Sequence, residues 1–194
     1  PDFVPLFDGS SLDGWIGSEG VWRVEGGAIV GGSLSEAVGG PNEFLCTTAE
    51  YQDFELRLQF RVQGDEANGG VNVRSQRRDD GTAAGYQADL ADGIWGSIYD
   101  EGRRNRFLQS TLFDPIVNAD WNDFVIRCEG PRIRVWLNGT LTADYVETEE
   151  VPVRGIIALQ VQAGRAVAMS YRNLRLAELS TDEVEAKEEE SVPK

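Results

Sequence analysis

The sequence predicts an all-β protein, an antiparallel β-sandwich or jelly roll, on two observations. In the segment 54–62 apolar residues alternate with charged or polar ones, and a period of two is typical of a strand with one buried face. The 22 glycines separate short apolar runs and indicate turns, and no segment carries the apolar period of a three-turn helix. About ten or eleven strands separated by such turns favour a sandwich.

The individual strands follow from the positions of the apolar residues. Around the strand at 54–62, short apolar runs predict further strands at 21–24, 28–30, 44–46, 70–74, 86–90, 155–161 and 166–176. Between 121 and 146 the alternation predicts a meander of three strands, joined by a Gly130-Pro131 turn and an Asn138-Gly139 hairpin turn. Turns this short place the three strands side by side in one sheet.

One domain is predicted at 1–179, because 194 residues are enough to bury a sizeable core. The last segment, 180–194, is STDEVEAKEEESVPK, which holds six acidic residues and little apolar content. Such a composition predicts a solvated tail, and we expect any partner that this tail contacts to be a protein.

The composition excludes several classes of function. The net charge of -15 argues against nucleic acid and anionic membrane surfaces as partners, because both would repel the chain. The sequence has no histidine, which excludes histidine-based catalysis and Cys/His metal sites. No apolar run reaches the roughly 18 residues of a membrane span. Cys46 and Cys128 could form a disulfide or remain two separate buried thiols.

The segment GYQADLAD, 85–92, carries the first candidate site residues. Strand alternation places Gln87 and Asp89 on one face and the apolar residues between them on the other. In the segment GGVNVR, Asn72 and Arg74 share a face in the same way. An amide, a carboxylate and an arginine on one sheet face suit a sugar-binding cleft. Alternatively, Arg74 is an exposed arginine on a solvated sheet face.

The segment after residue 92 is predicted to be a long loop, because no strand or helix period fits it. It places two aromatic residues beside acids and arginines: Trp95, Tyr99, Asp100, Glu101, Arg103 and Arg104. Aromatic rings cover the apolar face of a sugar ring and charged groups bind its hydroxyls, so the loop suits carbohydrate. In the alternative, the aromatic residues cap the core and the charged residues form a surface ion-pair cluster.

Motifs in a fixed order run through residues 5–177: PLFDGSSLDGW, WRVEGGAIVGG, GGVNVRS, GYQADLAD, GSIYDE, IRVWLNG, GIIALQVQAG and YRNLRL. In this order they resemble the 3-keto-disaccharide hydrolase domain family. The resemblance implies a concanavalin A-like lectin/glucanase sandwich that acts on glycosides with a 3-keto ring. It also implies export, to the periplasm or elsewhere outside the cytoplasm, and the start at Pro1 would fit a removed signal peptide.

Two departures from the family pattern concern the site. Many members have a glutamate followed by a glutamine where this sequence has Gln87 and Asp89, so the carboxylate and the amide exchange places. Members also often carry a histidine after a Leu-Gln pair, whereas Val161 follows Gln160 here. Both departures favour an alternative function: a non-catalytic sandwich that serves as a binding or structural subunit of a larger extracytoplasmic or membrane-associated complex.

If the chain is an enzyme of this type, the reaction requires particular catalytic groups, which can be assigned to candidate residues. A 3-keto group acidifies the proton on C2, so the site needs a base, a group that stabilises the enolate and an acid for the leaving group. We predict Asp89 as the base, Arg74 as the enolate stabiliser, and Asp100 or Tyr99 as the acid. The predicted substrate-binding residues are Gln87, Trp95, Glu101, Arg103, Trp121, Asn122 and Gln160. An ordinary glycosidase with Asp89 and Glu101 as its two carboxylates is a further alternative.

This chemistry requires no metal and no other cofactor. Calcium is the alternative that the acidic residues leave open, because Ca²⁺ takes oxygen ligands. The candidate ligands, if the loop folds back onto the strand, are Asp89, Asp92, Asp100 and Glu101.

Overall fold

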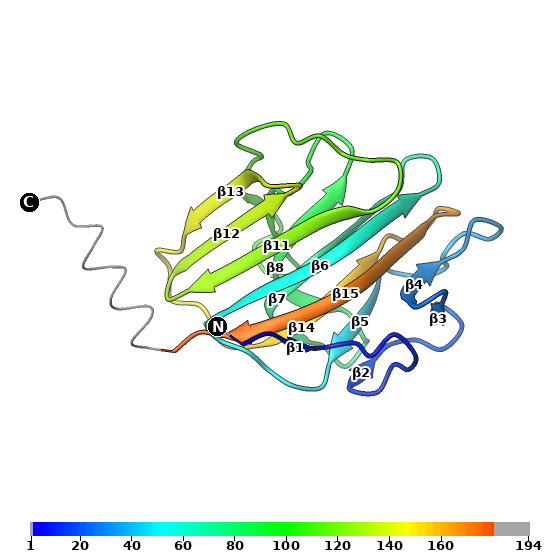
Figure 1. Ribbon diagram of the computed structural model, residues 1–194, viewed down its shortest axis with the longest axis horizontal. Coiled ribbons are helices and arrows are strands. Elements are labelled where there is room, and N and C mark those ends of the chain that lie inside the picture. Colours follow the sequence, from blue (N-terminus) through cyan, green and yellow to red (C-terminus); the bar gives the residue numbers. More distant parts are fainter. Residues whose placement is uncertain (1, 181–194) are drawn as a thin grey trace, which may run out of the picture.

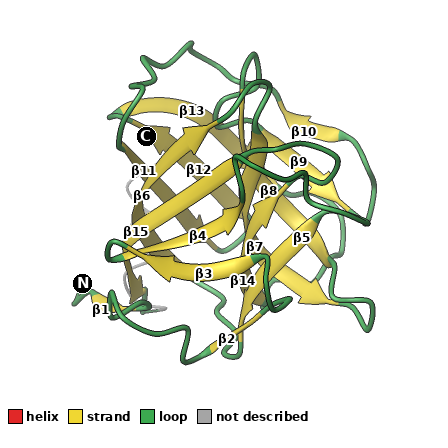
Figure 2. Cartoon of the chain, turned by 90° about the vertical axis from the view of Figure 1, so that its right-hand side faces the viewer, coloured by secondary structure: helices red, strands yellow, loops and turns green. Residues whose placement is uncertain are grey.

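The computed structural model describes residues 2–180, which form two antiparallel β-sheets packed face to face (Figures 1 and 2). The predicted all-β sandwich is therefore confirmed. The described residues contain no helix, and so none that is long and apolar enough to cross a membrane. The predicted acidic tail lies outside the described residues, apart from Ser180.

The first sheet has eight strands among the described residues, in the order β13-β12-β11-β6-β15-β4-β3, and β1 pairs with β15. In Figure 1 its long central strands lie side by side across the face of the molecule. The bounds are β13 (Thr140–Val146), β12 (Arg132–Leu137), β11 (Asn122–Glu129), β6 (Phe54–Gln63), β15 (Ala168–Glu178), β4 (Ala28–Gly32), β3 (Trp22–Glu25) and β1 (Val4–Pro5).

The second sheet has seven strands in the order β10-β9-β8-β7-β14-β5-β2. Neighbouring strands in this order are hydrogen-bonded, so residues far apart in the sequence come together in its middle. The bounds are β10 (Phe107–Gln109), β9 (Ile98–Glu101), β8 (Ala83–Ala91), β7 (Asn68–Arg77), β14 (Ile156–Val161), β5 (Glu43–Thr47) and β2 (Trp15–Ile16).

Every strand predicted from the sequence is present, with its ends shifted by a few residues. The short strands β1, β2, β9 and β10 were not predicted. The prediction of one long loop after residue 92 is wrong for Ile98–Glu101, which forms β9 and pairs with β8. The alternation in β9 is hidden because a charged residue, Asp100, occupies an inward position beside the apolar Ile98.

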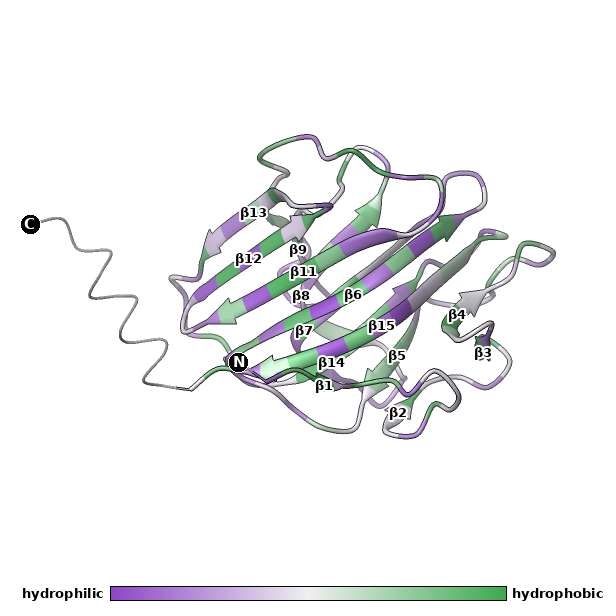
Figure 3. Ribbon diagram, viewed as in Figure 1, coloured by the Kyte–Doolittle hydropathy of each residue, from purple (hydrophilic) through white to green (hydrophobic). Residues whose placement is uncertain are grey.

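The hydrophobic core fills the space between the sheets. Phe60 and Phe124 of the first sheet and Val71 and Leu159 of the second are fully or almost fully buried in it. Burying one such side chain contributes about 1.5–3 kcal/mol. Figure 3 shows the alternation that produces this core, because hydrophobic and hydrophilic residues follow one another along β6, β11 and β12.

Tyr171 of β15 ties the two sheets together. Its hydroxyl group donates a hydrogen bond of 3.0 Å to the carbonyl oxygen of Gln160 and lies 3.3 Å from that of Gly70. Both carbonyls belong to the second sheet, on β14 and β7. The first sheet therefore fixes the backbone of the second at these two positions.

The two cysteines are free thiols, and both are buried. Cys128 lies in the core between the sheets, whereas Cys46 packs with Phe44 and Ala158 in a separate apolar cluster of the second sheet. Of the two alternatives that the sequence left open, the structure shows the pair of separate buried thiols.

Candidate functional site

The outer face of the second sheet carries a cluster of polar side chains from four adjacent strands. Register places Gly70 of β7 directly opposite Asp89 of β8 and opposite Gln160 of β14. In the neighbouring row Asn72 of β7 lies opposite Gln87 of β8. Residues directly opposite in antiparallel strands share a face of the sheet. We call this cluster the polar face: Asn72, Gln87, Asp89, Tyr99, Glu101 and Gln160.

The alternation predicted for GYQADLAD is confirmed. Tyr86, Ala88 and Leu90 point into the core, and Gln87 and Asp89 therefore project from the opposite side of β8. β9 extends the same face, because Tyr99 lies opposite Gln87 and Glu101 lies opposite Gly85. Five of the predicted site residues, two from β8, two from β9 and Gln160 from β14, thus meet on one face.

Asp89 is the most perturbed acid of this face. It is only 3% exposed, and burial is the main reason why its pKa is raised to about 7. Hydrogen bonds from Gln87 Nε2, at 2.8 Å, and from Ser97 Oγ, at 3.3 Å, act in the opposite direction and lower the pKa. The nearby charge of Glu101 raises it further. Asp89 is therefore a carboxyl group that changes its protonation state near neutral pH.

Polar atoms without partners lie beside this carboxyl group. Asn72 is fully buried, and neither its Nδ2 nor its Oδ1 has a hydrogen-bond partner among the described residues. Gln87 Oε1 is also without one. A buried polar group with no partner costs about 1–3 kcal/mol, so such groups are normally satisfied by water or a ligand. One amide donor and two amide acceptors are therefore free to bind hydroxyl or carbonyl groups.

Gly70 leaves the room that Gln87 needs. A Cβ atom at position 70 would lie 2.7 Å from Gln87 Cγ and 2.9 Å from Gln87 Cδ, closer than real Cβ contacts. The side chain of Gln87 consequently lies against this glycine and reaches Asp89 on its own strand.

Tyr99 and Glu101 are the partly exposed members of the polar face. Burial raises the pKa of Glu101, and Arg78 partly offsets that effect. Burial also raises the pKa of Tyr99, with further contributions from the charges of Glu101 and Asp89. Tyr99 and Glu101 are therefore the titratable side chains of the polar face that a ligand can reach from solvent.

Arg74 does not lie on the polar face. The register of β7 shifts between Val73 and Gln76, and Arg74 adopts a φ of 47°, which is typical of a β-bulge. Its guanidinium group donates hydrogen bonds to the carbonyl oxygens of Gln52 and Gly130, each at 2.7 Å, and to Asp53 Oδ1 at 2.8 Å. The bulge breaks the alternation that placed Arg74 beside Asn72, and the arginine joins the second sheet to two turns of the first.

Asp100 and Arg103 also lie away from the polar face. Asp100 lies opposite Tyr86 and is fully buried, and it forms ion pairs with Arg103, at 2.8 Å, and with Arg104. The guanidinium of Arg103 stacks 4.6 Å above the ring of Tyr86. Three of the four charged residues of the alternative ion-pair cluster thus come together, around a buried and not a solvated carboxylate, whereas Glu101 lies on the polar face. Arg104 also pairs with Glu147, at 2.6 Å.

The predicted aromatic platforms are not part of the polar face either. Trp95 stacks on Phe60 at a centroid distance of 6.1 Å and caps the core. Trp121 packs under the guanidinium groups of Arg172, at 4.0 Å, and Arg61, at 4.9 Å, which belong to the first sheet. Asn122, the first residue of β11, is buried and bonds to the backbone of Asn118 and Asp120 and to the side chain of Asn138.

Within residues 2–180 no three His, Cys, Asp or Glu side chains come close enough to hold a metal ion. The four candidate calcium ligands do not converge. Asp100 points into the core side of β9 and is neutralised by arginines, while Asp92 lines a surface groove with Trp95.

Two residues of the site received no role from the sequence. Asn72 was predicted to lie on the correct face, because it alternates with Val71 and Val73, which point into the core. Ser97, which donates to Asp89, had no recognisable signal, because it stands in a turn before β9.

Comparison with known families identifies the domain. The sequence model of the 3-keto-alpha-glucoside-1,2-lyase-like domain matches residues 2–177. The chain belongs to this family. The lyase-like domain thus spans almost all of the described residues and includes every strand of both sheets except the last residue of β15. The resemblance inferred from the motifs is confirmed. A comparison with curated proteins gave no match.

Solved structures share the fold of this lyase-like domain. A predicted glycosyl hydrolase from Parabacteroides distasonis superimposes with a TM-score of 0.71 at 22% identity, over 92% of this chain and all of the other. The carbohydrate-binding module CBM66 from Bacillus subtilis gives 0.66 at 18% identity, over 85% and 96% of the two chains. The exoplasmic/lumenal domain of VIP36, bound to Ca²⁺ and Man3GlcNAc, gives 0.65 at 11% identity, over 97% and 92%. The sandwich is therefore of the lectin type.

Proposed function

We propose that the polar face binds a 3-keto-glycoside and that Asp89 is its general base. The observation that carries the proposal is the buried carboxyl group of Asp89, with a pKa of about 7, beside amide atoms that have no partner. A base is most effective when its pKa lies near the working pH. Membership of the lyase-like family supports the choice of a ketone-bearing substrate.

In the proposed reaction the ketone at C3 acidifies the hydrogen on C2. Asp89 takes this proton, and the electron pair of the C–H bond forms an enolate whose charge rests on the ketone oxygen. The enolate then collapses, the C1–C2 double bond forms, and the bond between C1 and the aglycone oxygen breaks. The aglycone oxygen keeps that electron pair and receives a proton. Addition of water across the double bond completes a hydrolysis, and without it the reaction is an elimination.

The remaining residues of the polar face supply the other roles. Asn72 Nδ2, a buried donor without a partner, stabilises the enolate oxygen in place of Arg74, whose guanidinium is held elsewhere. Glu101 and Tyr99, whose raised pKa values keep them protonated to a higher pH, donate the proton to the leaving group. Gln160 and the free carbonyl of Gln87 bind ring hydroxyls.

The second candidate is a non-catalytic module that serves as a binding or structural subunit. One observation favours it: Asn72, Gln87, Asp89 and Gln160 are each at most 3% exposed. A substrate can contact Asp89 only after the side chains around it move. A structural module would not need such a movement. In both proposals the protein works outside the cytoplasm.

The experiment that separates the two is incubation with 3-keto-trehalose, with release of glucose followed over time. We expect release by the native protein and at least a hundredfold less by Asp89→Asn, because loss of a general base costs about 10²–10⁴ in rate. If the folded native protein leaves several 3-keto-disaccharides intact, the enzyme proposal is wrong and the non-catalytic module is the remaining proposal.

A further inference from the structure

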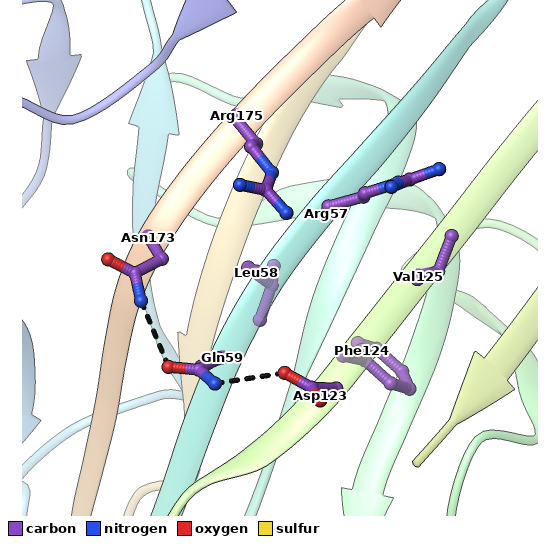
Figure 4. A pocket seen from close by; sticks show the side chains of 8 residues that line it. All are labelled: Arg57, Leu58, Gln59, Asp123, Phe124, Val125, Asn173 and Arg175. Atoms are coloured by element: carbon purple, nitrogen blue, oxygen red, sulfur yellow. Dashed lines mark hydrogen bonds between the residues drawn. The ribbon is translucent and has the colours of Figure 1, made fainter. Parts of the chain in front are cut away.

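A groove of about 300 Å³ crosses the outer face of the first sheet, on the side of the molecule opposite the polar face. It runs between β15, β6 and β11, and Figure 4 shows the side chains that line it. The lining includes Arg57, Gln59, Asp123, Val125, Asn173 and Arg175. Its volume is at the lower end of the range for small-molecule sites, about 300–1,000 Å³.

Arg57 and Arg175 both line the groove. Arg175 of β15 lies directly opposite Arg57 of β6, and like charges in this position destabilise a sheet. Arg57 is paired with Glu55 at 2.5 Å, but Glu55 also binds Arg127 at 2.8 Å. No ion pair joins Arg175 to any residue from 2 to 180, and its nearest aromatic contact is the ring of Phe3 at 5.8 Å. An anion at these arginines would relieve the repulsion.

The groove is also lined by a chain of neutral and acidic hydrogen-bonding groups. Asn173 Nδ2 donates to Gln59 Oε1, and Gln59 Nε2 donates to Asp123 Oδ1, each at 2.9 Å (Figure 4). Asn173 sits in a bulge of β15, where the register shifts between Arg172 and Arg175 and φ is 55°. Bulges re-aim side chains, and this one turns an amide toward the groove.

Together these groups fit one kind of ligand. A carboxylate suits guanidinium groups such as those of Arg57 and Arg175, and sugar hydroxyls suit amide and carboxylate oxygens. We propose that this groove binds a hexuronate residue of an acidic glycan, with its carboxylate at Arg57 and Arg175 and its ring hydroxyls at Gln59, Asn173 and Asp123. The site is independent of the reaction proposed for the polar face, since it shares no residue with it.

The test is a titration of the full chain with glucuronate, followed by amide chemical shifts, at low salt. We expect shifts confined to β6, β11 and β15, at least tenfold weaker binding by Arg175→Gln, and loss of affinity as salt rises. Arg154→Gln is the matched control, because Arg154 is similarly exposed and lies outside the groove. Both variants should fold, since each alters an exposed side chain.

Glucose and acetate are the control ligands, because glucose has the ring hydroxyls of glucuronate without its carboxylate and acetate has the carboxylate without the ring. We expect neither to reach a tenth of the affinity of glucuronate. Acetate binding as tightly as glucuronate would reduce the groove to an anion site and overturn the sugar assignment. Shifts that appear elsewhere, or that persist unchanged in Arg175→Gln, would overturn the site itself.

Discussion

The side-chain amide of Gln87 donates a hydrogen bond of 2.8 Å to the carboxylate of Asp89, two residues further along β8. The same amide keeps its carbonyl oxygen free of partners among the described residues. Gln87 therefore does two things at once: it stabilises the ionised form of Asp89 and offers an acceptor to a ligand. The exchange of carboxylate and amide relative to the family pattern still leaves a base and an amide side by side.

Replacing Gln87 should move the titration of Asp89. Its hydrogen bond lowers the pKa of Asp89, so Gln87→Met, which keeps the volume but removes the donor, should raise that pKa above about 7. The carboxyl ¹³C shift of Asp89, followed against pH, measures the change. Gln160→Met is the control, because Gln160 lies on the same face without bonding to Asp89. An unchanged titration in Gln87→Met would show that the bond is not formed in solution.

The stability of the fold should depend on Asp89 and pH. The pKa of Asp89 is raised by burial from 3.8 to about 7, so the folded state prefers the protonated acid. Its contribution is fully present below about pH 4 and is lost as the pH rises through 7. Asp89→Asn should thus match the native protein near pH 4 and exceed its unfolding free energy by about 2–4 kcal/mol above pH 8.

Denaturant unfolding at several pH values checks this prediction. Asp92→Asn serves as its control, because Asp92 is exposed in the turn that follows β8. A constant difference between Asp89→Asn and the native protein at all pH values would mean that the pKa of Asp89 is the same in the folded and the unfolded state.

Gly70 should be intolerant of a methyl group. In Gly70→Ala the new Cβ atom would lie 2.7 Å from Gln87 Cγ, and the displaced amide would lose its bond to Asp89. We expect a destabilisation of about 1–3 kcal/mol and a rise in the pKa of Asp89. Gly39→Ala, where no atom lies within 4 Å of the new Cβ and φ is ordinary, should change neither. Equal effects of the two substitutions would contradict the close approach.

Arg74 should act on stability and not on chemistry. Arg74→Met removes three hydrogen bonds and leaves Asp53 without its buried ion-pair partner, which should cost about 3–5 kcal/mol. The fraction that remains folded at low temperature should keep its activity. Arg154→Met, at an exposed arginine, is the control. A variant as stable as the native protein but inactive would restore the role of enolate stabiliser.

The sequence predicts well where alternation is uninterrupted. Gln87 and Asp89 were placed on the correct face because the apolar residues on either side leave only one inward face for β8. The face on which these side chains lie depends only on the two-residue alternation of the strand. The core that buries the opposite face fixes that alternation.

Prediction fails where a long-range contact decides the position of a side chain. Arg74 sits in a bulge that no local signal marks, and its carbonyl partners belong to distant turns. Trp95 folds inward onto Phe60, from a strand more than thirty residues earlier in the sequence. Asp100 faces inward because Arg103 and Arg104 compensate its charge, and that compensation exists only once β9 pairs with β8.

Exchange of the C2 hydrogen with solvent reports directly on proton removal by Asp89. The native protein is incubated with a 3-keto-glucoside in D₂O, and loss of the C2 proton signal is followed by NMR beside Asp89→Asn and Asp92→Asn. The account predicts that the native protein and Asp92→Asn speed the loss of this signal, and that Asp89→Asn reduces the acceleration at least a hundredfold, in line with loss of a general base worth about 10²–10⁴. Exchange by Asp89→Asn at the native rate would show that another group removes the proton.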